Sequence, residues 1–360
     1  MNLIEEVRPG ANRYVSGVGV LKDLPEYLRD FEKIAVITGE QSYQVFSDFY
    51  QGEFTFPVFR YDGTASTANG RALASEIGKA DVILAIGGGR VIDTAKVVAR
   101  ELGCDLVVVP TLISNCAPYT PVAALYHSNH TFDKVDYFAR GAYLTLVDWE
   151  FLLVTPREYL VAGIGDTVAK WYEMEGIVRH VAPEDLTASV RLGFASAKTV
   201  FKILFEDSAE ALQALENQEV TPAFGRIADT IIELSGTVGG FAGSYGRMSG
   251  AHALHNGLSL LPETHPILHG SKVAYGVLVQ LAYTGDLAEV EKLLPFYAAS
   301  DLPTRLAELN ITGFDRQKLL SVAEFAASSK ESYVLIDSEV TGEKVLDAIE
   351  KLEQFVAKIV

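Results

Sequence analysis

Four of the seven histidines in this 360-residue chain lie in one short stretch, AHALHNGLSLLPETHPILHG. They are His252, His255, His265 and His269. His252 and His255 are three residues apart, so on a helix they share a face. A single histidine on an apolar face is usually a hydrogen-bonded core residue, but this clustering indicates metal chemistry. Two imidazoles and one carboxylate with an open coordination position form the usual catalytic zinc or iron(II) site. The spacing by itself does not choose which histidines bind.

A candidate carboxylate occurs in GIGDTVAKWYE (163–173), where Asp166 follows glycine in a small and apolar stretch with a helical pattern. An exposed or capping aspartate explains the same residue equally well when it is considered alone.

A second candidate site is the turn Gly87-Gly88-Gly89, between the apolar run DVILAIG and the helical pattern RVIDTAKVVAREL. Glycines let a ligand approach the backbone, and the free N–H groups at a helix N-terminus favour an anion such as a pyrophosphate. The turn matches neither GxGxxG nor the P-loop pattern. The alternative is a tight turn without a ligand.

The elements that must position these residues divide the chain into two parts. Apolar runs at 33–40, 55–63, 81–89 and 105–111 alternate with helical patterns, which predicts a parallel sheet with helices on both faces. Segments 122–127 and 142–149 suggest a less regular pair of strands. From Thr155-Pro156, a helix start, the pattern is mostly helical. We predict an α/β nucleotide-binding domain over 1–154 and an all-α metal-binding and substrate domain over 155–360, with the ligand site between them.

Composition and charge narrow the class of protein. The net charge of −17 disfavours partnership with nucleic acid or anionic membrane surfaces. The two cysteines, Cys104 and Cys116, are typical of a reduced, cytoplasmic protein. We find neither a signal-peptide pattern at the N-terminus nor an apolar stretch of about 18 residues that would cross a membrane.

Four ordered motifs carry a family resemblance: GGGRVIDTAKVVA, PTLISNCAPYTP, AGIGDTVAKWYE and AHALHNGL…ETHPILHGSKVAYG. Together they resemble the metal-dependent, "iron-containing" alcohol dehydrogenases of the glycerol dehydrogenase group, which share a dehydroquinate synthase-like architecture. The segments SNCAPYTP and HGSKVAYGVLVQ resemble the bacterial hydroxycarboxylate dehydrogenase branch. The resemblance implies that Asp166, His252 and His269 hold the metal. It places His255 beside the metal as a candidate catalytic residue that contacts substrate or relays a proton, and leaves His265 a structural role.

The resemblance also implies a nicotinamide cofactor, NAD or NADP, and the residues around it. Those residues are Gly87, Gly88, Gly89, Asp93, Lys96, Thr111 and Ser114, with Gly39 and Glu40 beside the adenosine ribose. Many NAD-preferring relatives carry aspartate where this chain has Gly39, so NADP has room, although Glu40 could repel its 2′-phosphate. Glycerol dehydrogenases carry an aspartate at the position of Cys116, where it contacts the polyol. The cysteine therefore favours a substrate other than glycerol.

These observations predict reversible hydride transfer between a nicotinamide and a small 2-hydroxycarboxylate or 2-oxo acid, assisted by one divalent metal, zinc in preference to iron. A glycerol dehydrogenase is the first alternative. A dehydroquinate-synthase-like lyase or polyol-phosphate dehydrogenase would need a basic cluster that we do not see near the metal motifs. An iron oxygenase would leave the glycine turn unexplained, and a protein with a structural zinc would need a fourth ligand, such as His255. Relatives are generally oligomeric, which predicts a homo-oligomer.

Overall fold

The computed structural model describes residues 6–128 and 131–359. The chain forms two compact units. One is an α/β unit of residues 8–157 and 213–237, and the other is a helical unit built mainly from 158–212 and 238–359. The predicted fold class, a parallel α/β first part followed by a helical second part, is confirmed.

The α/β unit is built on a six-stranded sheet of order β1-β8-β5-β4-β2-β3 in which all neighbours pair in parallel. Its strands are β1 (Tyr14–Gly17), β2 (Ile34–Thr38), β3 (Val58–Arg60), β4 (Val82–Gly87), β5 (Asp105–Pro110) and β8 (Leu144–Asp148). Because the strands are parallel, β2, β4 and β5 all end at one edge of the sheet. Their carboxyl ends therefore bring Gly39, Gly87 and Thr111 to that edge.

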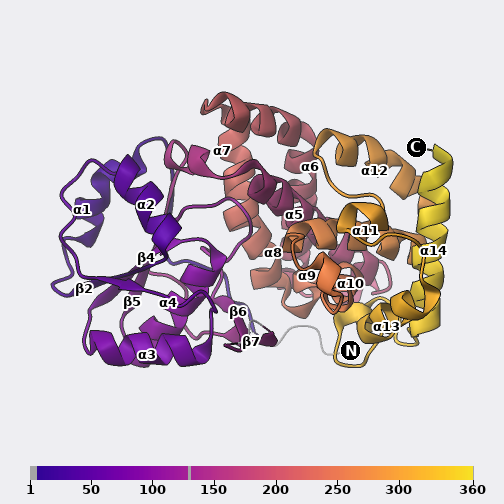
Figure 1. The fold of residues 1–360 in the computed structure, drawn as a ribbon, viewed down its shortest axis with the longest axis horizontal. Helices are drawn as coiled ribbons and strands as arrows, with labels where there is room; N and C mark the ends of the chain where they lie inside the picture. Colours follow the sequence, from indigo (N-terminus) through magenta and orange to yellow (C-terminus); the bar gives the residue numbers. More distant parts are fainter. Residues whose placement is uncertain (1–5, 129–130, 360) are drawn as a thin grey trace. The chain divides into compact units, whose positions relative to one another are not determined.

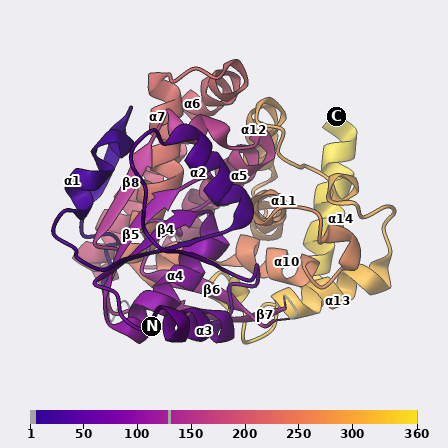
Figure 2. The ribbon, with the colours of Figure 1, turned by 60° about the vertical axis from the view of Figure 1, so that its left-hand side comes forward.

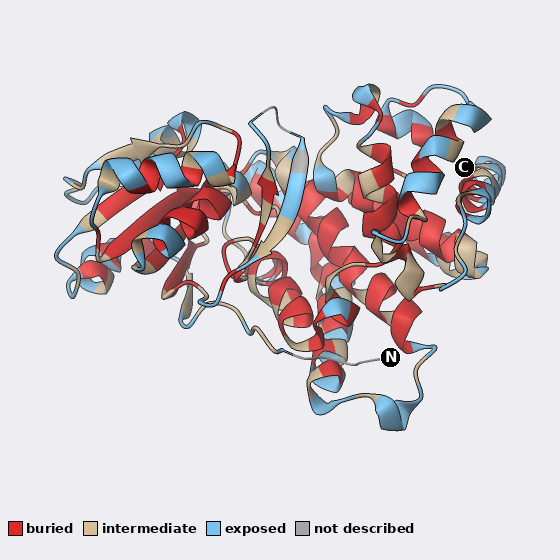
Figure 3. Ribbon diagram, turned by 90° about the horizontal axis from the view of Figure 1, so that it is seen from below, coloured by how far each residue is buried: buried red, intermediate tan, exposed pale blue. Residues whose placement is uncertain are grey.

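Helices cover both faces of this sheet, because its strands are apolar on both sides. In β2, Ile37 packs in a cluster with residues of α3 (Thr67–Ile77) and α4 (Gly89–Leu102). The adjacent Val36 faces the opposite cluster, with residues of α1 (Leu24–Leu28) and α2 (Glu40–Phe49). Figure 1 shows α1 and α2 on one side of the strands and α3 on the other. In Figure 3 the buried residues follow the strands and the inward faces of these helices.

The later strands differ from expectation. β6 (Val122–Tyr126) pairs antiparallel with β7 (Phe132–Tyr137), so the suggested pairing of 122–127 with 142–149 is wrong. Strand β8 instead inserts between β1 and β5, where all five of its residues are buried. A fully buried apolar run suits a central parallel strand rather than a half-exposed hairpin. Strand β1, at the edge of the sheet, was not predicted.

The helical unit packs around α5, α10 and α11. Its helices are α5 (Arg157–Val178), α6 (Ala188–Asn217), α8 (Ser235–Ala242), α9 (Ser244–Arg247), α10 (Gly250–Leu258), α11 (His269–Thr284), α12 (Leu287–Ala299), α13 (Arg316–Ala326) and α14 (Gly342–Ile359). α10 contacts both α11 and α13, and α14 packs on α11 and α13 (Figure 2).

One segment of the helical half of the sequence joins the α/β unit rather than the helical unit. It contains α7 (Pro222–Asp229) and the π-helical turn Thr230–Leu234. Asp229 accepts hydrogen bonds from Tyr14 Oη (2.8 Å) and Ser16 Oγ (3.0 Å) of β1, and Gly225 lets the ring of Trp149 approach α7. These contacts tie α7 to the sheet.

No helix in residues 6–128 and 131–359 is both long enough and apolar enough to cross a lipid bilayer.

Candidate functional site

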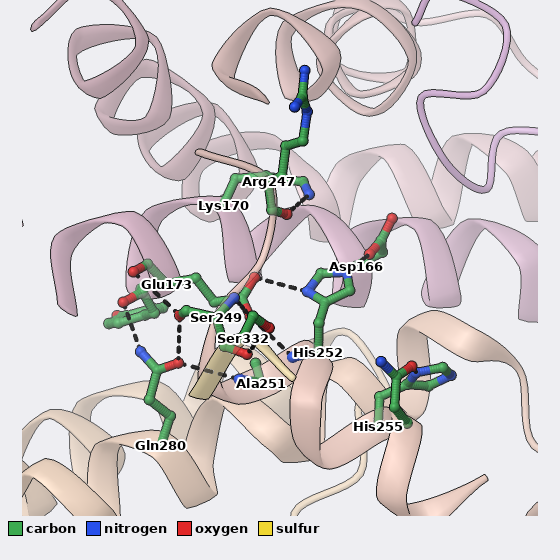
Figure 4. Close-up of polar contacts among 12 residues, drawn as sticks. Asp166, Lys170, Glu173, Arg247, Ser249, Ala251, His252, His255, Gln280 and Ser332 are labelled. Carbon is green, nitrogen blue, oxygen red and sulfur yellow. Dashed lines mark hydrogen bonds and ion pairs between the residues drawn. The ribbon is translucent and has the colours of Figure 1, made fainter. Parts of the chain in front are cut away.

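Helix α5 presents three buried charged side chains in its largely apolar middle part. Asp166, Lys170 and Glu173 are spaced by four and seven residues, so they share one face (Figure 4). All three are buried, with exposed fractions of 7% or less, and buried charges need partners. The partners come mainly from α10 and the start of α11.

Two histidines meet Asp166 at this face. Oδ1 of Asp166 lies 3.2 Å from Nε2 of His252 and 3.4 Å from Nε2 of His269. One donor atom from each of the three residues lies within 4.8 Å of the others, which is a spacing that could hold a metal ion. Metal–ligand bonds of about 2.0–2.1 Å in a tetrahedron separate neighbouring ligand atoms by about 3.3–3.4 Å. The donor set and its spacing therefore fit a divalent ion.

Two glycines let α5 and α11 approach closely enough to form this cluster. A Cβ on Gly165 would lie 2.6 Å from the carbonyl oxygen of Gly270. A Cβ on Gly270 would overlap the carbonyl of Ala162 and lie 3.0 Å from the backbone nitrogen of Asp166. Backbone atoms cannot rotate away as a side chain can. The glycines beside Asp166 and His269 thus set the distance between these two candidate ligands.

Glu173 fixes His252 from behind. Its Oε2 accepts a hydrogen bond from Nδ1 of His252 (2.7 Å), and its Oε1 accepts from the backbone N–H groups of His252 (2.9 Å) and Ser249 (2.6 Å). One carboxylate therefore caps the N-terminus of α10 and holds the tautomer that leaves Nε2 facing Asp166. A carboxylate on the second nitrogen is the usual support of a metal-binding histidine.

The carboxylates of this cluster stay ionised despite burial. Burial raises the pKa of Asp166, but hydrogen bonds from His252 and His269 hold that pKa well below its ordinary value. Burial also opposes charge on His252, yet Glu173 and Asp166 together raise the pKa of its ring to about 9. Burial raises the pKa of Glu173, but the charge and ring hydrogen bond of His252 hold it below its ordinary value. The charge of Lys170 also lowers the pKa of Glu173 and of Asp166, and its Nζ donates to the carbonyl oxygen of Arg247 (2.9 Å). Lys170 thus balances charge within the site.

The other two histidines take different positions. Nε2 of His255 lies 3.0 Å from Nδ1 of His269, on the side of that ring opposite Asp166, and the donor atoms of His255 do not join the cluster of three. Burial and the charge of His269 hold the pKa of His255 well below its ordinary value. His265 is exposed and its Nε2 lies 3.2 Å from the carbonyl oxygen of Ser259, a surface contact.

In the α/β unit, the glycine turn connects β4 to α4. Gly88 is the N-cap of α4, and no side chain caps that helix. None of the three glycines has a positive φ, so they are needed for space. A Cβ on Gly87 would lie 2.6 Å from Cβ of Val91, and one on Gly89 would lie 3.1 Å from Nδ2 of Asn115. Uncapped N–H groups at the start of a 14-residue helix suit a pyrophosphate.

The neighbouring candidate residues, Asp93, Lys96 and Thr111, are buried and less accessible to a ligand. Asp93 and Lys96 form a buried ion pair (3.0 Å), and their remaining bonds go to the backbone of β6 at Val122 and Ala124. Burial raises the pKa of Asp93, while Lys96 lowers it. This pair holds β6 against α4. Thr111 is buried and follows β5, with its N–H donating to the carbonyl oxygen of Gly87 (3.2 Å).

Ser114 and Cys116 lie in the loop that follows β5, and both are partly buried. The thiol of Cys116 is free, and a Cβ on Gly236 of α8 would lie 3.4 Å from Cβ of Cys116. The loop is closed by N–H donation from Tyr119 and Thr120 to the carbonyl oxygen of Cys116, each 3.0 Å.

Gly39 and Glu40 begin α2 at the carboxyl end of β2. A Cβ on Gly39 would lie 3.0 Å from the ring of Tyr61 and 3.3 Å from Oγ of Ser42. Glu40 is 84% exposed, and its Oε1 lies 3.1 Å from Nε of Arg60. A basic residue therefore faces the acidic one at this position.

Sequence reasoning overlooked three contributors to the helical site. They are Glu173, the pair Gly165 and Gly270, and the residues that contact His255, Asn256 and through it Glu331. Glu173 could have been found, because seven residues after Asp166 is the same helix face. The contact between Gly165 and Gly270 joins segments distant in sequence, so spacing gave no signal for it.

Comparison with known proteins agrees with this architecture. Residues 11–149 match the family model "Iron-containing alcohol dehydrogenase". The chain is 38% identical over 298 residues to hydroxycarboxylate dehydrogenase A of Escherichia coli (strain K12), covering 82% of each chain. It is 34% identical over 361 residues to the glycerol dehydrogenase of Thermotoga maritima, covering 95% of each. A crystal structure of a probable glycerol dehydrogenase from Sinorhizobium meliloti 1021 superposes with a TM-score of 0.87 at 30% identity, covering 98% of this chain and 100% of the other.

The chain belongs to the iron-containing alcohol dehydrogenase family. It is an oxidoreductase that acts on CH–OH groups and uses a nicotinamide cofactor and a divalent metal, as sequence analysis predicted.

Proposed function

We propose that this enzyme interconverts a small 2-hydroxycarboxylate and its 2-oxo acid. The observation that carries the proposal is Cys116, which supplies a thiol where a polyol-binding dehydrogenase carries a carboxylate. Replacing that carboxylate by a thiol removes a charged acceptor for substrate hydroxyls. It also removes the negative charge that would repel the carboxylate of a substrate. The 38% identity to a hydroxycarboxylate dehydrogenase supports the same substrate class, while the 34% identity to a glycerol dehydrogenase keeps glycerol as the second candidate.

In this proposal Asp166, His252 and His269 hold the metal through one oxygen and two Nε2 atoms. The bound ion would supply Lewis acidity, and the nicotinamide would supply the hydride chemistry. Asp166 and His252 are buried, whereas the side chain of His269 is 50% exposed, so substrate would approach from the side of His269. Because Glu173 holds the proton on Nδ1 of His252, Nε2 is the nitrogen that would give up its proton and bind the ion.

We propose zinc in preference to iron. The separations of 3.2 and 3.4 Å from Asp166 Oδ1 to the two Nε2 atoms match a tetrahedral edge of about 3.3–3.4 Å. Three protein ligands leave the fourth position for substrate. Metal analysis of the protein as purified, with activity regained after chelation by zinc or by iron(II) alone, tests this choice.

For the cofactor we propose NADP(H). Arg60 is in register with Thr38, the residue before Gly39, and the guanidinium stacks 4.2 Å over the ring of Tyr43. Its Nη1 is a buried atom with no hydrogen-bond partner among the residues that the structure describes. An arginine near the adenosine ribose accommodates a 2′-phosphate, Gly39 supplies no acid, and Arg60 pairs with the adjacent acid Glu40 (3.1 Å) and offsets its charge. Calorimetry would show Arg60→Gln weakening adenosine 2′,5′-bisphosphate about tenfold relative to adenosine 5′-monophosphate. An equal effect on both nucleotides would contradict the assignment.

The reaction is tested with zinc-loaded protein, NADH or NADPH, and 2-oxo acids beside dihydroxyacetone, following the loss of reduced nicotinamide absorbance. Asp166→Ala and His252→Ala serve as controls. Turnover of 2-oxo acids that both substitutions abolish supports the proposal. Turnover of dihydroxyacetone alone makes the enzyme a glycerol dehydrogenase. Nicotinamide binding without turnover of any carbonyl supports a lyase or a polyol-phosphate substrate.

We also propose a cytoplasmic homo-oligomer. Support comes from the two unpaired cysteines, Cys104 and Cys116, and from the family resemblance. Light scattering of the purified protein measures the number of subunits.

A further inference from the structure

His269 presents a positioning problem that His252 does not. A carboxylate holds Nδ1 of His252 directly, whereas the ring of His269 is half exposed and meets another imidazole, that of His255. A metal ligand must keep one nitrogen unprotonated and aimed at the ion, and a hydrogen bond to its other nitrogen normally does so. Whether His255 can perform this task depends on which of its nitrogens carries the proton.

A series of hydrogen bonds that begins at Glu331 determines which nitrogen of His255 carries the proton. Oε2 of Glu331 lies 2.9 Å from Nδ2 of Asn256, and a carboxylate only accepts, so the amide nitrogen donates to it. This orients the amide oxygen of Asn256 toward Nδ1 of His255, 2.9 Å away. Nδ1 must therefore carry the proton of His255, which leaves its Nε2 as an acceptor. At 3.0 Å that atom accepts from Nδ1–H of His269, so Nε2 of His269, beside Asp166, is the nitrogen that would give up its proton and bind the ion.

The opposite assignment brings acceptors into contact. A proton on Nε2 of His255 would leave Nδ1 facing the amide oxygen of Asn256, and reversing the amide would place that oxygen against the carboxylate of Glu331. Ser259 Oγ also lies 3.4 Å from Nε2 of His255. It does not alter this result, because its single proton goes to the backbone carbonyl oxygen of His255 (2.9 Å) and it accepts from Lys272 Nζ (2.9 Å).

Glu331, the first residue of this series of hydrogen bonds, is itself held in place. Glu331 precedes the 3-10 turn Ser332–Leu335, and Ser332 Oγ donates to the carbonyl oxygen of Ser249 at the start of α10 (2.7 Å). In Figure 4, Ser332 and Ser249 lie together on the side of His252 away from His255. The loop that carries Glu331 is thus attached to the helix that carries Asn256 and His255.

We propose that Glu331, Asn256 and His255 act in series as positioning residues that fix the tautomer and ring orientation of His269 for metal binding. The proposal rests on the metal site of the proposed function. It assigns His255 to the support of His269, in place of the contact with substrate that the family resemblance implied. Each imidazole of the metal site then depends on a glutamate, His252 directly on Glu173 and His269 through two intermediates on Glu331.

The first test reads the tautomers in the unmodified enzyme. Nitrogen-15 NMR of histidine-labelled, zinc-loaded protein should show His255 and His269 both protonated at Nδ1. Protonation of His255 at Nε2 overturns the proposal, whatever the variants do.

The second test measures zinc affinity by competition with a chelator. Glu331→Met and Asn256→Leu should each raise the Kd for zinc by about 10- to 100-fold. The Kd of the double variant should be no higher than that of the weaker-binding single variant, because both substitutions break the same series of hydrogen bonds. Glu331→Gln, which keeps an acceptor for Asn256, should stay within about threefold of the wild type. Ser332→Ala controls for loosening of the loop, since it removes the anchor but leaves the series of hydrogen bonds.

The outcomes separate the two proposals. If the wild type binds zinc tightly and Glu331→Met and Asn256→Leu bind it equally well, the positioning role of Glu331 and Asn256 is refuted and the metal site stands. Failure of the wild type to bind zinc overturns both. A loss in Glu331→Gln or Ser332→Ala as large as in Glu331→Met reduces Glu331 to a structural residue of the loop.

Discussion

The glycine pair between α5 and α11 yields a prediction that can be worked from the coordinates. In Gly270→Ala the new Cβ would lie 2.6 Å from the carbonyl carbon of Ala162 and closer still to its oxygen. Carbon atoms pack at about 3.5 Å, so the carbon alone demands a displacement of at least about 0.9 Å. The ligand atoms of His269 and Asp166, now 3.4 Å apart, would move to about 4.3 Å.

That separation exceeds what one ion can span in a tetrahedral site. Two bonds of about 2.0–2.1 Å reach about 4.2 Å only when they lie in a straight line. We therefore expect Gly270→Ala to raise the Kd for zinc at least about 100-fold, equivalent to about 2.7 kcal/mol. Overpacking should also lower the free energy of unfolding by about 1–3 kcal/mol.

The assay is zinc affinity by chelator competition, beside thermal unfolding of the metal-free protein. Gly193→Ala is the matched control, because its Cβ would lie 3.0 Å from the backbone nitrogen of Ala242 and 3.1 Å from the carbonyl oxygen of Val238. Those contacts join α6 to α8, which carry no ligand, so this variant should lose stability and keep zinc affinity. Zinc binding by Gly270→Ala within about threefold of the wild type would refute the reasoning.

Three further predictions follow from other contacts. Glu173→Gln should raise the Kd for zinc about 10- to 100-fold, because an amide cannot accept from all the donors that face the carboxylate; an unchanged affinity would contradict its support of His252. Cys116→Asp should lower kcat/KM for 2-oxo acids relative to kcat/KM for dihydroxyacetone by at least about tenfold. An unchanged ratio would count against Cys116 as a residue that contacts substrate. Hydrogen bonds from Tyr283, the backbone and Lys344 lower the pKa of Asp337 to about 2, below the value of about 3.9 in an unfolded chain. That stabilisation is complete above pH ~5 and is lost as the pH falls from about 5 to about 1, so Asp337→Asn should cost about 1 kcal/mol at pH 7 and nothing near pH ~1 in paired unfolding curves; a cost independent of pH would contradict the shift.

Much of the arrangement follows from local pattern in the sequence. Continuous apolar runs predict buried parallel strands, and the glycines after 82–87 predict an open helix N-terminus at the carboxyl edge of the sheet. The spacing of Asp166, Lys170 and Glu173 places three polar groups on one helix face. These features depend on residues within two helical turns or one strand, where geometry is fixed by the backbone.

The tertiary structure decided what those groups do. His255 and His269 are 14 residues apart, and only the packing of α11 on α5 places His269 across from Asp166 with His255 behind it. Glu331 lies 75 residues from Asn256, and no local period connects them. A hydrogen bond acts over about 3 Å, so its partners are determined by which backbones approach, not by distance along the chain. Here that approach was decided by Gly165 and Gly270, whose missing side chains allow two helices to share one site.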